Sequence, residues 1–370
     1  MQFGTKANKE CEHTDNTRCI GRVIRLAHGV IGADCEPFIV AEMSGNHIQS
    51  LDMALSIVDA AHRAGAHALK LQTYTPDSMT INHDGEGFTI TDPDSPWNGR
   101  RLYDLYRESC MPWEWHATIF ERCRSLGVIP FSSPFDIAAV QFLEQLDTPA
   151  YKIASFEIVD TPLIKACAKT GKPLIISTGM ASPAEVFDAV DVARSSGCRD
   201  IVLLKCTSTY PSSPADSNLA TIPAMRELFK CEVGLSDHTT GVGVAVAAVA
   251  LGAVVVEKHF TISRALGGAD SAFSLEPAEL SMLVSECRRA WQAVGEIHIG
   301  VTESEKASLR LRRSLYAVRD IPSGSTIGRE DIRAIRPGLG LSPKHMESVI
   351  GMRARCDIVR GTPLTFSLVG

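Results

Sequence analysis

The sequence predicts a (β/α)8 TIM barrel, a closed ring of eight parallel strands surrounded by helices, followed by a small second domain. Between residues 38 and 259, a short β-rich apolar run ending in polar residues alternates with an Ala-rich segment of helical length. Eight such units over this length are typical of a closed parallel barrel. The expected strands are Phe38–Glu42, Ala68–Gln72, Val128–Ser132, Ala150–Ser155, Leu174–Thr178, Ile201–Cys206, Glu232–Ser236 and Val254–His259.

Local signals for helices and turns agree with this prediction. Ser50 is a suitable N-cap for a helix that runs to Gly65, and Ser182-Pro183-Ala184-Glu185 combines an N-cap with Pro in the first turn and Glu at its third position. Before the barrel, residues 20–34 alternate apolar and polar side chains around His28-Gly29. This pattern predicts an antiparallel hairpin that plugs the bottom of the barrel.

The chain is expected to divide into four parts. Residues 1–19 are rich in Lys, Glu, Asp, Thr and Asn and lack an apolar h-region, which favours a disordered extension over a secretion signal. Residues 20–298 form the barrel and residues 299–311 a linker. The remaining residues, 312–370, contain short apolar runs separated by Pro and Gly, which indicates a small domain with a modest core.

Composition and charge exclude several classes of function. Hydrophobic residues make up 45% of the chain and charged residues 22%, a balance typical of a globular protein. The net charge is -6 without a basic run, so nucleic acid is not an expected partner. The longest apolar stretch, Gly241 to Val256, is too short to cross a bilayer, so no membrane association is expected. Eleven cysteines without CxxC pairs favour reduced thiols and a cytoplasmic location.

Polar side chains gather at the C-terminal ends of the expected strands, where barrels of this kind place their active sites. They form one ring, which predicts a single site at the barrel mouth. The ring consists of Glu42, Lys70, Gln72, Ser132, Ser133, Lys152, Ser155, Ser177, Thr178, Cys206, Ser236, Asp237, His238, Glu257, Lys258 and His259.

Two lysines in this ring, Lys70 and Lys152, suggest a site for a phosphate or carboxylate. An ammonium group provides a point charge, and the surrounding hydroxyls orient the anion's oxygens. An alternative is that one lysine forms a Schiff base, which requires a pKa lowered by burial or by a neighbouring cation. The hydroxyls favour the anion clamp, but both alternatives remain open at this stage.

Two histidines, His238 and His259, end neighbouring expected strands and can reach one point. Imidazole is a common ligand of divalent transition metals, so these residues are the candidate metal pair. With no obvious third protein ligand, the remaining coordination positions would be open to water or substrate, as Lewis-acid catalysis requires. Asp237 and Glu257 are candidates for orienting residues or further ligands.

Several motifs in order along the chain resemble those of the nonulosonic (sialic-type) acid synthases. The resemblance extends from about Ile20 to the C-terminus, and so many motifs in one order are far more specific than any one alone. The motifs are Ala41-Glu42-Met43-Ser44-Gly45-Asn46-His47, Leu69-Lys70-Leu71-Gln72-Thr73-Tyr74, Phe131-Ser132-Ser133-Pro134-Phe135-Asp136, Tyr151-Lys152-Ile153-Ala154-Ser155-Phe156-Glu157, Ser177-Thr178-Gly179-Met180, Gly234-Leu235-Ser236-Asp237-His238-Thr239, Glu257-Lys258-His259-Phe260-Thr261 and Ile335-Arg336-Pro337-Gly338.

The resemblance implies a phosphoenolpyruvate (PEP)-condensing barrel followed by an antifreeze-like (SAF) domain. It also implies a domain-swapped homodimer in which each small domain caps the partner's barrel. The residues expected to bind PEP are Lys70, Ser133, Lys152, Ser155, Ser177 and Ser236, with Gln72 and Glu157 as further substrate-binding residues. His238 and His259 are expected to bind Mn²⁺ or Mg²⁺, and Glu42 to act in acid/base catalysis. Tyr210, Asp270 and Arg336 match sugar-binding positions, the arginine coming from the partner chain.

Within the family, the segments around Asn46, Glu157 and Asp270 resemble the pseudaminic type, and Phe156 and Phe273 suit the methyl group of a 6-deoxy sugar. The expected reaction joins PEP to 2,4-diacetamido-2,4,6-trideoxy-L-altrose and gives pseudaminic acid and phosphate. The alternatives are an N-acetylneuraminic or legionaminic acid synthase and, in a different class, a non-catalytic sugar-binding protein. One departure is Ile48, which stands where the family motif usually has a second Asn.

Overall fold

The computed structural model describes residues 23–93 and 95–370. The described residues fall into two compact units, one ending at Gly295 and the other beginning at Glu296. The expected extension over residues 1–19 lies outside the described residues. No helix in the described ranges is long and apolar enough to cross a membrane.

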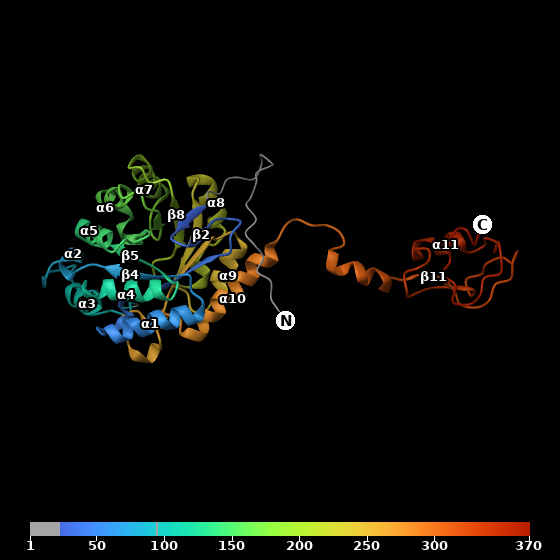
Figure 1. Ribbon diagram of the computed structural model, residues 1–370, viewed down its shortest axis with the longest axis horizontal. Helices are drawn as coiled ribbons and strands as arrows, with labels where there is room; N and C mark the ends of the chain where they lie inside the picture. The colour runs from blue at the N-terminus through green and yellow to red at the C-terminus, as the bar shows by residue number, and fades with distance from the viewer. Residues whose placement is uncertain (1–22, 94) are drawn as a thin grey trace. The chain divides into compact units, whose positions relative to one another are not determined.

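The first unit is a closed parallel barrel in the strand order β10-β3-β4-β5-β6-β7-β8-β9 (Figure 1). The prediction of a (β/α)8 barrel is therefore confirmed, and each expected strand matches an observed one to within about two residues at either end. The barrel strands are β3 (Phe38–Glu42), β4 (Ala68–Thr73), β5 (Ile129–Pro134), β6 (Tyr151–Ile153), β7 (Leu174–Ser177), β8 (Ile201–Cys206), β9 (Glu232–Asp237) and β10 (Val255–His259).

Helices surround the barrel, and their ends follow the capping signals in the sequence. The Ser50 hydroxyl accepts a hydrogen bond from the amide of Met53 at the start of α1, and Gly65 ends that helix at φ 87°, where a side chain would be strained. Ser182 and Glu185 form a capping box at the start of α7. The helices of this unit are α1 (Leu51–Ala64), α2 (Pro76–Met79), α3 (Leu102–Ser109), α4 (Trp115–Ser125), α5 (Ile137–Gln145), α6 (Thr161–Ala168), α7 (Pro183–Ser195), α8 (Thr221–Phe229), α9 (Gly243–Ala250) and α10 (Pro277–Val294).

Alternate residues of each strand face opposite sides, which produces two apolar layers. One cluster lies between strands and helices and includes Ile39, Leu69 and Leu203. The other fills the barrel interior and includes Val40, Ala68, Phe131, Ile175 and Val202. The barrel interior is apolar except at the C-terminal ends of the strands, where polar side chains line it. Groups able to bind substrate are therefore confined to that mouth of the barrel.

The N-terminal hairpin of β1 (Ile24–Leu26) and β2 (Gly29–Ile31) is present as predicted. Ile24, Leu26 and Ile31 are buried in the same cluster as the barrel interior, so the hairpin closes the barrel's lower end. Gly29 is required there, because a Cβ at this position would lie 2.8 Å from side-chain atoms of Ile129 and Phe38.

The second unit contains one antiparallel pair, β11 (Ser314–Ala317) and β12 (Ile332–Ile335), and a short helix, α11 (Met346–Val349). Its own core includes Leu315, Ile321, Ile358 and Leu364. The short strands and small core agree with the sequence of this region, in which Pro and Gly separate short apolar runs.

Candidate active site

A cavity of about 960 Å³ opens at the C-terminal ends of the barrel strands. The predicted site residues line it, with the exceptions of Ser133 and Arg336. Those present are Glu42, Lys70, Gln72, Lys152, Ser155, Glu157, Ser177, Tyr210, Ser236, His238, His259 and Asp270. The strand ends therefore bring side chains from seven of the eight barrel strands, and from the loops that follow them, to one place.

The two lysines of the cavity converge on a carboxylate oxygen of Glu257. Lys70 Nζ lies 3.0 Å from Glu257 Oε1, and Lys152 Nζ lies 3.5 Å from the same oxygen. Ser236 Oγ donates to that oxygen as well, at 3.3 Å. Lys152 Nζ also donates to Ser177 Oγ at 2.7 Å. Since all of these donors are buried, they form a preorganised site for an anionic oxygen.

Glu42 lies on the other side of Lys70, at the end of the neighbouring strand. The two residues are paired in register, and Lys70 Nζ lies 3.3 Å from Glu42 Oε2. Gln72 Nε2 donates to Glu42 Oε1 at 3.1 Å. Burial raises the pKa of Glu42 to about 7, despite the opposing effect of Lys70. Glu42 can therefore both accept and release a proton near neutral pH.

The two buried carboxyl groups of the cavity differ in their proton affinity. Burial alone would raise the pKa of Glu257, but Lys152 and Lys70 outweigh it and hold that pKa at about 2. Glu257 is thus a fixed anion, while Glu42 carries a proton for part of the time. Environments that separate two carboxyl pKa values in this way are typical of acid/base assignments in active sites.

The lysines also differ from each other. Burial would lower the pKa of Lys70, but Glu257 and Glu42 outweigh it and raise the pKa. Burial lowers the pKa of Lys152. A Schiff base needs a lysine with a lowered pKa, so only Lys152 meets that condition, while Lys70 is held in its charged form.

His238 and His259 lie beside each other, with ring centroids 5.3 Å apart. His238 Nδ1 is 2.8 Å from the carbonyl oxygen of Thr207, which can only accept, so Nδ1 carries a proton and donates to that oxygen. His259 Nδ1 is buried without a hydrogen-bond partner, 3.9 Å from Asp270 Oδ2. Burial and then the nearby positive groups lower the pKa of His259 well below its usual value, which keeps the imidazole neutral.

These features fit a divalent metal, because imidazole nitrogens are good metal ligands and one nitrogen of this pair, His259 Nδ1, is buried without a hydrogen-bond partner. Among the described residues, no group of three or more His, Cys, Asp and Glu side chains is arranged to hold a metal ion. A metal at His238 and His259 would therefore complete its coordination with water or substrate.

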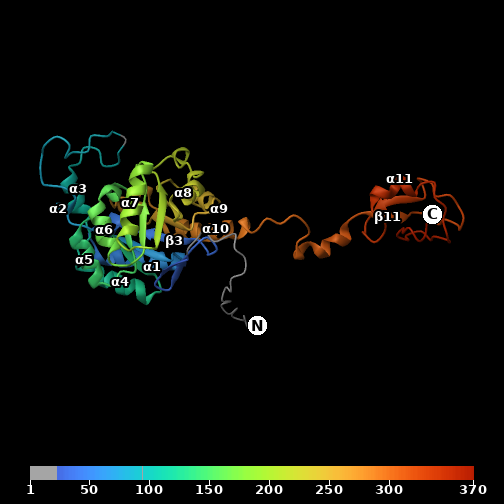
Figure 2. The same ribbon diagram turned by 90° about the horizontal axis from the view of Figure 1, so that it is seen from above.

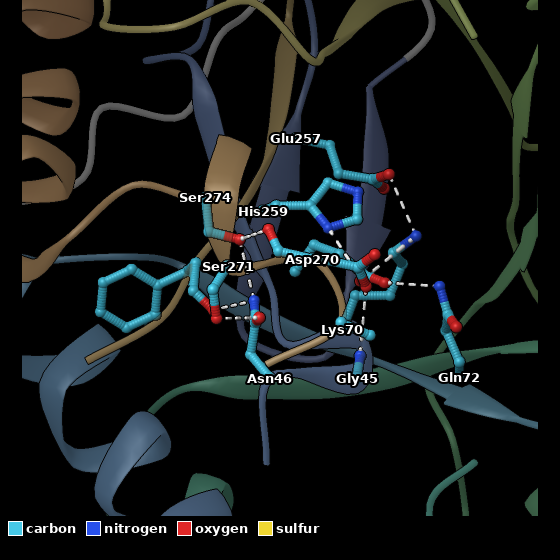
Figure 3. Close-up of polar contacts among 12 residues, drawn as sticks. Gly45, Asn46, Lys70, Gln72, Glu257, His259, Asp270, Ser271 and Ser274 are labelled. Atoms are coloured by element: carbon cyan, nitrogen blue, oxygen red, sulfur yellow. Dashed lines mark hydrogen bonds and ion pairs between the residues drawn. The ribbon is translucent and has the colours of Figure 1, made fainter. Parts of the chain in front are cut away.

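Asp270 and its neighbours are tied to the turn that follows β3 (Figure 3). The amide of Gly45 donates to Asp270 Oδ2 at 3.3 Å. Asn46 Nδ2 donates to Ser274 Oγ at 2.8 Å, and Ser271 Oγ donates to Asn46 Oδ1 at 3.1 Å. These bonds fix the segment after β10 beside His259, although it lies more than 200 residues away from Gly45 in the sequence.

Two predicted residues do not line the cavity. Ser133 shares the interior-facing side of β5 with Phe131, is 1% exposed, and its Oγ has no hydrogen-bond partner among the described residues. Arg336 follows β12 in the C-terminal unit.

Four residues of the predicted polar ring, besides Ser133, do not line the cavity because strand side chains alternate: Ser132, Thr178, Asp237 and Lys258. Thr178 Oγ1 donates to the carbonyl of Leu204 at 3.1 Å. Ser132 Oγ hydrogen-bonds with Thr73 Oγ1 at 2.6 Å, on the side of the strands that faces the helices. Asp237 and Lys258 pair with each other on that same side. Asp237 is therefore an orienting residue behind His238 rather than a ligand beside it.

Sequence reasoning missed Trp97, which lines the cavity from the long loop between α2 and α3. It also ranked Glu257 below the histidines, although Glu257 is the counter-ion of both lysines. Glu257 ends the eighth strand with His259, and the period-2 pattern already puts both on one face. No comparable pattern marks Trp97.

An eight-stranded barrel whose mouth combines buried lysines, a proton-holding carboxyl and paired imidazoles defines a class of α/β-barrel enzymes for small anionic substrates. A model of the NeuB family matches residues 57–299, and a model of the SAF domain matches residues 312–369. The chain belongs to the NeuB family and carries a C-terminal SAF domain, which confirms the resemblance found in the motifs.

Several relatives match nearly the whole chain. A protein of Campylobacter jejuni subsp. jejuni named pseudaminic acid synthase is 44% identical over 336 residues, which are 91% of this chain and 97% of that protein. A Legionella pneumophila protein named N,N'-diacetyllegionaminic acid synthase is 35% identical over 338 residues, 90% of this chain and 94% of that protein. The crystal structure of an N-acetylneuraminic acid synthetase from Leptospira borgpetersenii in complex with citrate has a TM-score of 0.70 at 30% identity, and the match covers 78% of this chain and 95% of that one.

Proposed function

We propose that this chain is a pseudaminic acid synthase, which condenses PEP with 2,4-diacetamido-2,4,6-trideoxy-L-altrose and releases phosphate. The observation that carries the proposal is the convergence of Lys70 and Lys152 next to the His238–His259 pair in one cavity. This arrangement combines an anion site with an electrophile site. The identity of 44% with the Campylobacter jejuni relative supports the choice of sugar.

PEP would bind at the donors that now surround Glu257 Oε1, namely Lys70, Lys152 and Ser236, with Ser177 beside Lys152. Two ammonium groups face one fixed carboxylate, because the raised pKa of Glu42 lets that group carry a proton. The residual positive charge favours an anionic substrate. Burial strengthens each of these interactions, since water does not screen them.

The sugar's aldehyde would lie by His238 and His259. A divalent metal held there, Mn²⁺ or Mg²⁺, would supply Lewis-acid polarisation of the carbonyl oxygen. Thr207 fixes the orientation of His238 through the proton on Nδ1, and Asp270 lies beside His259. This chain's own residues thus set where the carbonyl is placed relative to the lysine-bound PEP.

The reaction forms one carbon–carbon bond and breaks one carbon–oxygen bond. C3 of PEP attacks the aldehyde carbon, and the aldehyde oxygen takes up a proton to become a hydroxyl. Water adds at C2 of PEP and gives up one proton, which balances the proton taken up by the aldehyde oxygen. The C2–O bond then breaks, the remaining proton of the C2 hydroxyl leaves with phosphate, and a ketone is left at C2. We assign the net transfer of the proton from water to the aldehyde oxygen to Glu42, whose pKa near 7 suits both uptake and release.

The direct test is a panel of acetamido sugars incubated with PEP, with phosphate release and product mass as readouts. The proposal predicts that the altrose derivative is turned over with a kcat/KM at least about tenfold above that of N-acetylmannosamine or the legionaminic precursor. A preference for the legionaminic precursor, which the relative at 35% identity makes the second candidate, would contradict the choice of sugar. Binding of sugars without any phosphate release would indicate a non-catalytic sugar-binding protein.

Two further aspects of the function are proposals as well. We propose a homodimer in which Arg336 reaches the partner's cavity, because the residue follows β12 in a unit separate from the barrel. We also propose that the enzyme acts in the cytoplasm. Each cysteine in the described part of the chain is a free thiol, as expected in a reducing compartment.

A further inference from the structure

A long loop joins α2 and α3 (Figure 2). Some of its side chains, including that of Trp97, line the cavity. The loop folds back on itself, because the amide of Ile90 donates to the carbonyl of Arg100 at 2.9 Å and the amide of Gly99 donates to that of Ile90 at 2.8 Å. Arg101 ties its base together by an ion pair with Asp84, 3.0 Å from Nε to Oδ1. The loop is therefore a defined structural element.

Trp97 connects this loop to the opposite side of the barrel mouth. Its indole N–H donates to the carbonyl oxygen of Ala269 at 3.0 Å, next to Asp270. Its ring lies 5.8 Å from that of Tyr210 and 6.3 Å, edge to face, from that of Phe273. A partly buried N–H with a partner and two ring contacts hold the indole in one orientation.

The three aromatic rings form a wall that ends at the two histidines. Tyr210 lies 4.3 Å from His238, and Phe273 lies 5.0 Å from His259, measured between ring centroids. Tyr210 and Phe273 are themselves 5.2 Å apart. Lys70, Lys152 and Glu257 line the same cavity, which therefore combines these charged groups with the aromatic wall.

We propose that Trp97 is a specificity-determining residue that selects an acceptor sugar with an apolar group at C6. This inference rests on the proposed function. With the aldehyde at the histidines, an open-chain hexose extends over five carbon–carbon bonds of about 1.5 Å each. With the aldehyde carbon beside Tyr210, that length allows C6 to reach the indole of Trp97, whose ring lies 5.8 Å from that of Tyr210. A methyl group packs favourably on the indole face, whereas a hydroxymethyl group loses hydration against the same apolar ring.

The proposal is tested by measuring kcat/KM for two sugars that differ only at C6, the 6-deoxy altrose derivative and its 6-hydroxy counterpart. Trp97→Ala is expected to raise KM for the 6-deoxy sugar about tenfold and to reduce the preference between the two sugars by a similar factor. KM for PEP is expected to stay within about twofold, because the lysine side of the cavity is unchanged. Trp97→Phe keeps an apolar ring without the N–H bond, so it is expected to retain most of the preference.

Trp113 offers a matched control. Its indole N–H also donates to a backbone carbonyl, that of Tyr74 at 3.2 Å, and its ring packs on Phe142, but it does not line the cavity. Trp113→Phe should leave the preference at C6 unchanged. Trp97→Gln provides a second variant if Trp97→Ala fails to fold, and its polar side chain should favour the 6-hydroxy sugar relative to wild type.

The outcomes separate this proposal from the proposed function. If wild-type enzyme condenses PEP with the sugar but folded Trp97→Ala and Trp97→Gln keep the wild-type preference at C6, Trp97 has no role in selection and the proposal is wrong. If wild-type enzyme releases no phosphate with any acetamido sugar, the proposed function itself has failed. An equal loss of kcat with both sugars, at an unchanged ratio, would also contradict the assignment.

Discussion

Lys258 Nζ lies 2.8 Å from Asp237 Oδ2, and the two side chains are 1% and 2% exposed. Lys258 also donates to the carbonyl of Thr239 at 2.6 Å, and the other oxygen of Asp237 accepts from the amide and hydroxyl of Thr239. These bonds join the residues on both sides of His238 to the residue just before His259. The buried Lys258–Asp237 ion pair does not line the cavity, but it therefore fixes the separation of the two imidazoles from the side of the strands that faces the helices.

Removing one partner of this pair is expected to be costly. Lys258→Met leaves Asp237 charged and buried without its counter-ion, which should lower the free energy of unfolding by about 3–5 kcal/mol. The double variant Lys258→Met with Asp237→Asn should recover part of that loss, because it removes the unpaired charge. Denaturant titration monitored by circular dichroism measures both effects.

An exposed ion pair serves as the control for that experiment. Lys306 and Glu303 have side chains that are 61% and 86% exposed, so Lys306→Met should leave stability unchanged within error. A Lys258→Met protein as stable as wild type would show that the buried pair does not position the strand ends.

A second prediction concerns the backbone after β3. Ile48 has φ 45° and ψ 42°, the left-handed conformation, which is unfavourable for a β-branched residue. Asn tolerates this conformation, so Ile48→Asn should raise the free energy of unfolding by about 1 kcal/mol. The Ile48 side chain is 39% exposed and does not line the cavity, so a sugar contact does not explain the Asn expected at this position. The left-handed backbone conformation does explain it.

Denaturant midpoints of wild type and Ile48→Asn test this idea. Ile81, 60% exposed and outside the left-handed region, gives the control Ile81→Asn, which should not stabilise the protein. Equal shifts in the two variants would mean that surface polarity, not backbone conformation, causes the effect.

A third prediction concerns the proposed metal site. His238→Ala and His259→Ala should each weaken Mn²⁺ binding, measured by calorimetry, at least about tenfold, and abolish most turnover. His116→Gln is a suitable control, because His116 is also buried in the barrel unit but hydrogen-bonds Thr73 on the far side of the strands. Full activity of His238→Ala in the presence of a chelator would refute the assignment of a metal to this pair.

A fourth prediction tests whether Arg336 serves the partner's cavity. Chains with Arg336→Ala and chains with Lys70→Ala should each be inactive. After subunit exchange, a mixed dimer would contain one cavity with both residues intact, so activity should return to a fraction of the wild-type value. Mixed dimers without activity, once their formation is shown by mass, would mean that Arg336 does not act in trans.

Much of this architecture is predictable from the sequence because its signals are local and periodic. The strands ending at Glu42 and Cys206 match their predicted bounds, since apolar runs and helix caps define them directly. The alternation along β9 and β10 already implies that Asp237 and Lys258 face away from His238 and His259. The prediction of one uniform polar ring ignored this alternation.

Other features depend on contacts distant in the sequence and are not predictable in this way. Trp97 reaches the cavity because its loop folds on itself and its N–H meets Ala269, 172 residues later. Glu257 becomes the counter-ion of Lys70 and Lys152 only when three strands meet in a closed barrel. Neither relation leaves a pattern in the neighbouring residues.

In the proposed reaction, this cavity condenses PEP with an aldehyde sugar and breaks the C2–O bond of PEP. This reaction is tested most directly with PEP labelled with oxygen-18 in the C–O–P bridge, incubated with the altrose derivative and a divalent metal. Phosphate release should depend on the sugar, and the phosphate should retain the label because the bridging oxygen leaves with phosphorus. The nine-carbon acid should lack the label. Unlabelled phosphate, or phosphate released at the same rate without sugar, would contradict the proposed reaction.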